Sequence, residues 1–267
     1  MPLEHHQPDG LGKARRLNFF GTPIDLLSLE ESVSLAERAM ERREPMRHTA
    51  LNVAKLMKLG SDDDLAADVR GSDMIGIDGQ GIVYGLKLFG AHDVERVAGI
   101  DLFYALLARC AQTGRKPFIL GAKEEQLRKA MAEAQRRWPG LEFAGARNGY
   151  FGPQDEAEIV ERIASSGADC LFVAMPTPRK ERFLNGNADR LNVPFLMGVG
   201  GSVDVLAGHV SRAPVWMQKV GLEWFHRLVK EPRKMFVRYA KSNSAYTWLL
   251  LRTWISGRKP IEFPIAS

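Results

Sequence analysis

The chain has 267 residues, of which 45% are hydrophobic and 26% charged, and its formal net charge is +5. This composition excludes a disordered chain and suits one large α/β domain, alone or with an appendage. No window approaches the roughly 20 apolar residues that span a bilayer. The first ten residues lack the apolar core of a signal peptide. We therefore expect a cytoplasmic protein.

The positive charge is concentrated near the C-terminus. Residues 212–260 contain eleven Lys or Arg and two acidic residues, a local charge of +9 that leaves −4 for the remainder. A basic segment on a mildly acidic body favours an anionic surface or an anionic ligand as partner. The two cysteines, Cys110 and Cys170, have apolar neighbours and are expected to be buried thiols in a reducing compartment.

The first part of the chain predicts short strands and helices in alternation. Residues 16–28 (RLNFFGTPIDLLS) predict a strand, a Gly-Thr-Pro turn and the entry to a helix, which Ser28 and Glu31 begin as a capping box. Residues 48–59 predict a strand that breaks near Asn52 into a helix. A further helix begins at the acids of residues 62–64. Residues 74–78 (MIGID) predict a buried strand, followed by a helix over residues 81–90.

The same rhythm continues through the second part. We expect helices at residues 101–114, 124–140, 155–167 and 178–191, and strands within residues 116–122, 141–151, 169–175 and 193–201. Apolar strands that alternate with amphipathic helices predict a Rossmann-like α/β body, whose parallel sheet is covered on both faces. Ligands of such sheets bind beyond the carboxyl ends of the strands. The site is therefore expected in the loops at that edge.

The chain divides into three predicted parts. Residues 1–16 are expected to be a flexible tail, and residues 17–211 the α/β catalytic domain. Residues 212–267 are basic, have a helical periodicity and contain four of the five tryptophans. We interpret them as a helical appendage, whose apolar surface favours self-association into a homo-oligomer.

The segment DGQGIVYG at residues 78–85 raises two hypotheses. As a dinucleotide-binding loop it fits poorly, because its glycines are spaced one residue too long and Asp101 follows no clear strand end. The charge of Asp78 would also repel a pyrophosphate at the helix N-terminus. Alternatively, Asp78 is a general base for a hydroxyl group. A purely structural role for Asp78, as the cap of the following helix, stays open.

Two further loops carry candidate binding residues. Arg179, Lys180 and Arg182 fall in the first turn of a predicted helix, where cations oppose the helix dipole. They indicate either an anionic ligand or a solvated helix face. The sequence GVGGSVD at residues 198–204 allows the backbone to approach a ligand closely, or forms a tight turn between strand and helix.

No metal is expected at these loops. The six histidines lack the spacing of metal ligands, and no DxD pair at these loops invites a divalent cation.

At these residues the sequence resembles the WecG/TagA/CpsF family of bacterial glycosyltransferases (glycosyltransferase family 26). The resemblance covers Leu17 to Tyr239, and its most specific part is the run RAPVWMQKVGLEWFHRLVKEPRK at residues 212–234. The other matching segments are ALN at 50–52, GIDGQG at 76–81, ERVAGIDL at 95–102, PRKE at 178–181 and GVGGSVD at 198–204.

The resemblance implies transfer of a sugar from a UDP-sugar to a polyprenyl-diphosphate-linked saccharide, in bacterial surface or exopolysaccharide biosynthesis. It implies inversion at the sugar, no cofactor and no required metal. It also implies an appendage that docks on the cytoplasmic face of the inner membrane, and no nucleic-acid partner. The physics agrees, because without a metal arginines and lysines must stabilise the departing diphosphate.

The resemblance also implies roles for individual residues. Asp78 matches the family's proposed base. Ala50 stands where the family has Thr, with Thr49 one residue earlier, and Lys180 stands where the family commonly has Gln, a change compatible with an acidic sugar. The implied substrate-binding residues are Thr49, Asn52, Gly79, Gly81, Arg96, Asp101, Arg179, Lys180, Glu181, Gly198, Gly200, Gly201, Asp204, Arg212, Arg227, Arg233, Lys234 and Arg238.

The tryptophans of the appendage suit the headgroup layer of a membrane. Trp248 and Trp254 flank a Leu-rich stretch and are the best candidates for lipid contact, whereas Trp216 and Trp224 are expected to pack against the body. Two other functional classes stay open from residue patterns alone. One is a non-catalytic basic module that binds membrane or nucleic acid, and the other is an NAD-binding oxidoreductase.

Overall fold

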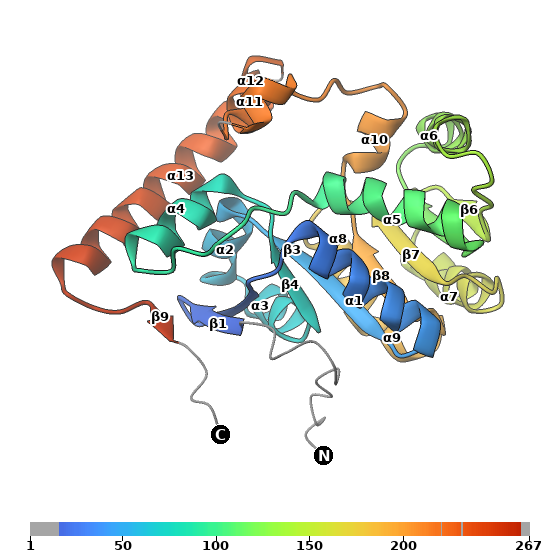
Figure 1. Ribbon diagram of the computed structural model, residues 1–267, viewed down its shortest axis with the longest axis horizontal. Helices are drawn as coiled ribbons and strands as arrows, with labels where there is room; N and C mark the ends of the chain where they lie inside the picture. The colour runs from blue at the N-terminus through green and yellow to red at the C-terminus, as the bar shows by residue number, and fades with distance from the viewer. Residues whose placement is uncertain (1–15, 220, 231, 263–267) are drawn as a thin grey trace.

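The computed structural model describes residues 16–219, 221–230 and 232–262 (Figure 1). The main sheet has six strands in the order β4-β3-β8-β7-β5-β6, and all of its pairs are parallel. The strands are β3 (Met46–Leu51), β4 (Met74–Ile77), β5 (Pro117–Gly121), β6 (Gly145–Arg147), β7 (Cys170–Ala174) and β8 (Phe195–Gly198). The predicted Rossmann-like α/β body is confirmed.

Helices cover both faces of this sheet. The first face carries α1 (Leu29–Arg42), α5 (Gly99–Thr113), α6 (Glu124–Arg137) and α10 (Ser202–Leu206). The second carries α2 (Val53–Leu59), α3 (Asp63–Arg70), α4 (Gln80–Leu88), α7 (Glu156–Ala164), α8 (Arg179–Gly186) and α9 (Ala188–Leu191). Along β5, Ile119 packs under the first layer and Phe118 and Leu120 under the second. Apolar residues on both faces explain the continuous apolar strands.

The passage from the turn near residues 21–23 straight into a helix is wrong, because the chain first turns back there as a strand. The predicted helix itself is confirmed, since it begins at Leu29 with the capping box of Ser28 and Glu31. The strands β1 (Arg16–Phe19), β2 (Thr22–Asp25) and β9 (Ile261–Glu262) form a small antiparallel sheet. Phe20 and Gly21 have positive φ values and make the turn. The buried carboxylate of Asp25 accepts hydrogen bonds from Arg16 across the hairpin and from the N–H of Ile75 in β4. This carboxylate joins the hairpin to the main sheet.

The single helix expected at residues 178–191 is also wrong, because α8 and α9 are separate. Asn187 lies between them, and its side chain donates to the Phe183 carbonyl and to Glu156 of α7. The side-chain amide therefore takes the carbonyl that the backbone N–H of Asn187 would use in a continuous helix, and it favours the break. Cys110 and Cys170 are buried thiols, as predicted, with their Sγ atoms 3.7 Å apart.

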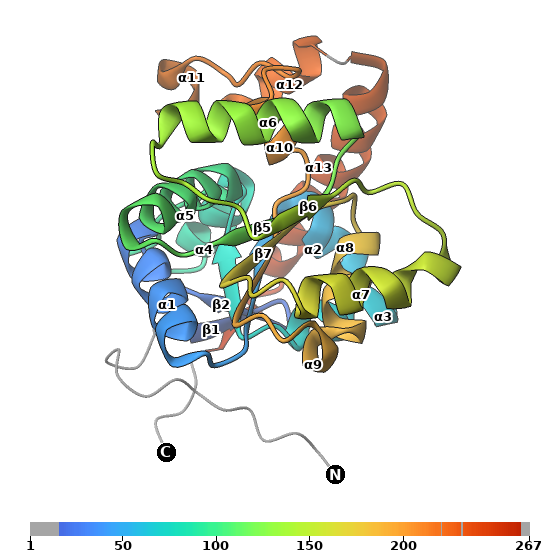
Figure 2. The same ribbon diagram turned by 90° about the vertical axis from the view of Figure 1, so that its right-hand side faces the viewer.

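The C-terminal segment is mostly helical. It forms α11 (Val215–Lys219), α12 (Glu223–Lys230) and α13 (Pro232–Ile255) before β9 pairs with β1. Figures 1 and 2 show α13 beside α2 and α4, with α11 and α12 at one end of it. Tyr246 of α13 is buried against α4 and donates its hydroxyl to the Gly81 carbonyl. No helix within the described ranges combines the length and the apolar composition that crossing a bilayer requires.

The expected flexible tail at residues 1–16 lies outside the described residues except for Arg16, which belongs to β1.

Candidate active site

The carboxyl ends of four neighbouring strands are followed by helices on alternating faces of the sheet. After β3 and β7 the chain enters α2 and α8 on the second face, whereas after β8 and β5 it enters α10 and α6 on the first. In open parallel sheets, ligands bind outside the strand ends where neighbouring connections diverge. Since β3, β8, β7 and β5 are consecutive in the sheet, these points adjoin. The topology therefore suits an elongated ligand along this edge.

Asp78 follows β4 directly and lies beside the end of β3. Its Oδ1 accepts a hydrogen bond from the N–H of Gly99 at 2.9 Å, and its Oδ2 accepts one from the Asn52 side chain at 3.4 Å. The residue that caps α4 is Gly79, so the interpretation of Asp78 as that cap is wrong. Gly99 begins α5, so the carboxylate accepts a hydrogen bond from the N-terminal end of that helix. Asp78 is also partly exposed, so a substrate can reach it.

The glycines near Asp78 are explained by close packing. A Cβ atom on Gly79 would lie 3.0 Å from Asn52 Cβ, and one on Gly81 would lie 2.5 Å from Val53 Cγ2. A Cβ atom on Gly85 would overlap the hydroxyl of Tyr246. The spacing that resembles a nucleotide loop therefore lets α4 approach β3, α2 and α13.

A cluster of buried charged groups lies between α2 and α8. Glu181 Oε1 is 2.9 Å from the Nζ atoms of both Lys55 and Lys180, and it accepts a hydrogen bond from Thr177 at 3.0 Å. Lys55 also donates to the Ala50 carbonyl at 2.7 Å, and Lys180 donates to the Thr177 hydroxyl. All three charged side chains are at most 12% exposed. Such burial is tolerated because the opposite charges are in direct contact.

This environment changes the pKa values of the cluster. Burial and the charge of Lys55 lower the pKa of Lys180 to about 8. Burial opposes ionisation of Glu181, but Lys55 and Lys180 outweigh it and lower the pKa of that carboxyl to about 2. Nearby on β3, burial and then Lys55 lower the pKa of His48 to about 4. At neutral pH the cluster therefore holds an ionised Glu181 and two lysines next to a neutral imidazole.

Arg179 organises a different part of the edge. Its guanidinium donates to the carbonyls of Gly149 at 3.1 Å and Phe151 at 2.8 Å, and lies 4.4 Å from the centre of the Phe151 ring. The N–H of Gly149 donates to the carbonyl of Ala122, just beyond β5. The residue between these two carbonyls, Tyr150, is 68% exposed. An ordered loop therefore presents an aromatic ring to solvent.

The C-terminal segment contacts the body close to Asp78. Arg212 makes two hydrogen bonds to Asp101 of α5, at 2.6 and 2.8 Å, and lies 3.4 Å from Glu223 of α12. Arg96 donates to the same Glu223 at 3.1 Å. Gly221 packs against Gln80, since a Cβ atom on it would lie 2.6 Å from Gln80 Cγ. The segment before α12 thus borders the β4 end of the strand edge.

A model of the glycosyl transferase WecG/TagA/CpsF family matches residues 17–260. The chain belongs to this family. It is therefore a glycosyltransferase, and the interpretations as an oxidoreductase or a non-catalytic binding module are set aside. The match includes most of β1, most of the C-terminal segment and every residue of the strand edge described above.

The structure brings only some of the predicted site residues of this glycosyltransferase together. Asn52, Asp78, Gly79, Lys180 and Glu181 gather at the ends of β4, β3 and β8, whereas Arg179 contacts the loop after β6. Arg96, Asp101 and Arg212 are paired through the network at α12. The alternative of a solvated helix face stays open for Arg179 and Arg182, which are exposed, but it does not fit Lys180, whose side chain is only 12% exposed. Arg182 pairs with Asp62 and Asp64.

Other predicted residues have varied surroundings. The buried hydroxyl of Thr49 is 2.9 Å from that of Ser72, within the body. Gly198 packs against the stem of Lys180, Gly200 has a φ of +53°, and the next residue, Gly201, leads into α10, which contains Asp204. The side chains of Arg227, Arg233, Lys234 and Arg238 lie outside the described part, so their contacts stay predictions.

Lys55 and Tyr150 were not predicted as site residues. Lys55 resembles an ordinary helix cation, and Tyr150 stands in a short loop without periodicity. The only available signal for Tyr150 was an aromatic residue between glycines after a predicted strand.

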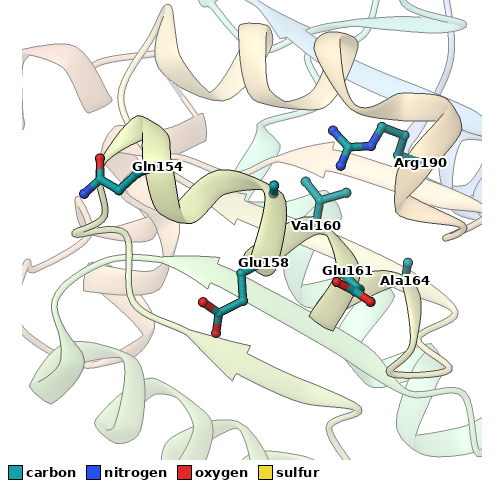
Figure 3. A pocket seen from close by; sticks show the side chains of 7 residues that line it. Gln154, Glu158, Val160, Glu161, Ala164 and Arg190 are labelled. Carbon is teal, nitrogen blue, oxygen red and sulfur yellow. The ribbon is translucent and has the colours of Figure 1, made fainter.

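Two further features bear on the site. Within the ranges that the structure describes, no group of three or more His, Cys, Asp or Glu residues is arranged to hold a metal ion. Figure 3 shows a surface hollow beside α7 that includes none of the strand-edge residues discussed above. It is lined by Gln154, Ala157, Glu158, Val160, Glu161, Ala164 and Arg190.

Proposed function

We propose that this glycosyltransferase moves a sugar from a UDP-sugar to a polyprenyl-diphosphate-linked saccharide with inversion, and that Asp78 is the general base. The observation that carries the proposal is the partly exposed carboxylate of Asp78, fixed by Gly99 and Asn52 at the end of β4. Inverting transfer needs a base that takes the proton of the acceptor hydroxyl, on the face opposite the departing UDP. A carboxylate oriented by two donors suits this task.

The rest of the edge suits the UDP part of the donor. From β4 to β5 there are four strand intervals of about 4.8 Å, or roughly 19 Å, which leaves room for an extended nucleotide sugar. With the sugar next to Asp78, the base would lie near Tyr150, whose exposed ring can stack on it. Lys180 lies between these points and can offset negative charge on the diphosphate. The C-terminal arginines, by the family resemblance, would add to this charge.

The C-terminal segment is proposed to contact the cytoplasmic face of the inner membrane. On α13, Trp248 is 67% exposed and Trp254 is 62% exposed, with Leu251 and Ile255 exposed beside them. Contrary to expectation, Trp216 and Trp224 are also 62% and 42% exposed. Exposed apolar and aromatic groups on a basic segment favour the interface of an anionic leaflet. Such contact would bring the enzyme to its lipid-linked acceptor.

The reaction is tested with purified protein, a panel of UDP-sugars and a polyprenyl-diphosphate saccharide in anionic vesicles. We expect release of UDP that requires the acceptor and is unchanged by EDTA, because the proposal needs no divalent cation. A parallel reaction with nuclease-treated protein excludes a contribution of bound nucleic acid to the UDP release. The absence of turnover with every UDP-sugar would contradict the proposal, and inhibition by EDTA that Mg²⁺ reverses would contradict the metal-free scheme.

The membrane contact is tested by the double variant Trp248→Ser/Trp254→Ser. We expect its partition onto anionic vesicles to fall about tenfold, while turnover of a water-soluble acceptor analogue stays at the wild-type level. Deleting the whole segment is a poorer test, because Tyr246 fills space next to α4 and its loss would destabilise the body. Unchanged partition of the double variant would argue against lipid contact at this end of α13. Self-association of the segment stays a prediction.

A further inference from the structure

Two buried lysines share one carboxylate beneath the strand edge. Lys55 comes from α2, and Lys180 and Glu181 come from α8. A single oxygen, Glu181 Oε1, faces both ammonium groups, while the buried Oε2 atom has no hydrogen-bond partner among the described residues. The three side chains together carry one unit of positive charge in a place where burial penalises charge. This surplus needs an explanation beyond stability.

The position of Lys180 indicates where the surplus acts. Its stem crosses Gly198, the last residue of β8, and a Cβ atom there would lie 2.9 Å from Lys180 Cδ. The end of β8 therefore leaves room for this lysine to run along the strand edge. Lys55, by contrast, is directed inward to the Ala50 carbonyl. Of the two cations, Lys180 is the one placed to meet a ligand.

We propose that Lys180 binds an oxyanion of the sugar donor, and that Lys55 and Glu181 are positioning residues that fix its place and its charge. The inference rests on the proposed function and names the anion contact within that site. The oxyanion is either a phosphate oxygen of UDP or a carboxylate on the transferred sugar, and both would neutralise the surplus charge of the cluster.

The charged groups that face Lys180 predict how the affinity for the oxyanion depends on pH. Burial and Lys55 lower the pKa of Lys180 to about 8, whereas Glu181 and Asp78, at the end of β4, oppose this shift. An oxyanion binds the protonated lysine, so affinity is full below that pKa and is lost as the pH rises through it. Neutralising Lys55 should therefore move the loss of affinity to higher pH, and neutralising Glu181 should move it to lower pH. A purely structural cluster predicts no such opposite shifts.

The experiment measures the dissociation constants of UDP, UDP-glucose and UDP-glucuronate by calorimetry between pH 7 and pH 9. For the wild type we expect affinity to fall about tenfold over this range, the change that a group with a pKa of about 8 produces. Lys180→Arg should abolish this pH dependence, because an arginine stays protonated. Lys55→Met and Glu181→Gln should shift its midpoint in opposite directions. Lys58→Met, on the exposed side of α2, is the matched control and should match the wild type.

Lys180→Gln identifies the source of the oxyanion. Weakening of all three ligands by about tenfold to a hundredfold at pH 7 assigns the contact to the diphosphate, and weakening of UDP-glucuronate alone assigns it to a sugar carboxylate. Unchanged affinity for all three would overturn the proposal. A midpoint of the pH dependence that is the same in the wild type, Lys55→Met and Glu181→Gln would also overturn it.

Thermal unfolding shows which variants are folded. If Lys55→Met or Glu181→Gln does not fold, Lys180→Arg and Lys180→Gln alone decide whether Lys180 binds the oxyanion. These binding data need no acceptor and no turnover. Failure of the anion contact is therefore separable from failure of the transfer reaction.

Discussion

The two ends of the strand edge differ in the kind of side chain that they present. At the end formed by β4, β3 and β8, the important groups are charged, namely Asp78, Lys55, Lys180 and Glu181. At the end formed by β5, β6 and β7, Arg179 holds backbone carbonyls and leaves Tyr150 exposed. Charge next to the reacting bond changes rates, whereas a fixed neutral ring changes affinity. The comparison indicates chemistry at one end and recognition of the base at the other.

The strongest test of the charged end is Asp78→Asn. A carboxamide keeps the size and the contact with Gly99 but cannot take a proton, so kcat should fall by about a thousandfold. The dissociation constant of UDP should change little, because Asp78 is assigned to the acceptor side. Steady-state kinetics and calorimetry measure the two effects. Asp189→Asn, at an exposed carboxylate on α9, is the control and should behave as wild type. Wild-type turnover in Asp78→Asn would reduce Asp78 to a structural group.

A smaller effect is expected from Tyr150→Ala, at the end formed by β5, β6 and β7. Loss of stacking should weaken UDP and raise the KM for the donor by about tenfold, with kcat nearly unchanged. Tyr150→Phe retains the ring and should bind UDP as the wild type does. A fall in kcat without a change in donor KM would show that the two ends are not divided as described. Equal affinity in both variants would remove Tyr150 from the site.

The smallest effect is expected from Arg179→Met. This change removes both hydrogen bonds to the loop that carries Tyr150, so the ring is less well fixed before the donor binds. UDP affinity should fall about fivefold through the loss of preorganisation, and combining the change with Tyr150→Ala should add little. Arg182→Met is the control, because Arg182 lies on the same helix and pairs with Asp62 and Asp64. Fully additive effects would indicate that Arg179 contacts the donor itself.

The sequence predicted the main sheet well for a physical reason. Residues buried on both faces produce apolar runs such as those of β5 and β7, and these runs are readable without tertiary information. The hairpin of β1 and β2 was missed because β2 contains only Thr22 to Asp25. It is joined to the main sheet by the hydrogen bond that the N–H of Ile75 donates to Asp25, and this contact is not visible in the local sequence. The pairing of β9 with β1 joins opposite ends of the chain, and no local pattern encodes it.

The site was predictable in part for a similar reason. Asp78 and Asn52 follow apolar strands, so their place at the edge could be inferred from the strands alone. Lys180 was recognised as a cation in an unfavourable helix position, but the carboxylate of Glu181 that it contacts is shared with Lys55, which comes from a helix far away in the sequence. Gly79 and Gly81 were interpreted as substrate contacts, although packing against Asn52 and Val53 accounts for both glycines. Tertiary contacts, which leave no short-range signature, decide each of these points.

A structure of the protein with UDP tests these assignments most directly. We expect the uracil ring against Tyr150, the diphosphate within hydrogen-bonding distance of Lys180 if the oxyanion is a phosphate, and no phosphate contact at Asp78. UDP whose phosphates lie at the start of α4, against Asp78, would contradict the assignment of that carboxylate to the acceptor. UDP bound away from the strand edge, as in the hollow beside α7, would contradict the proposed site as a whole.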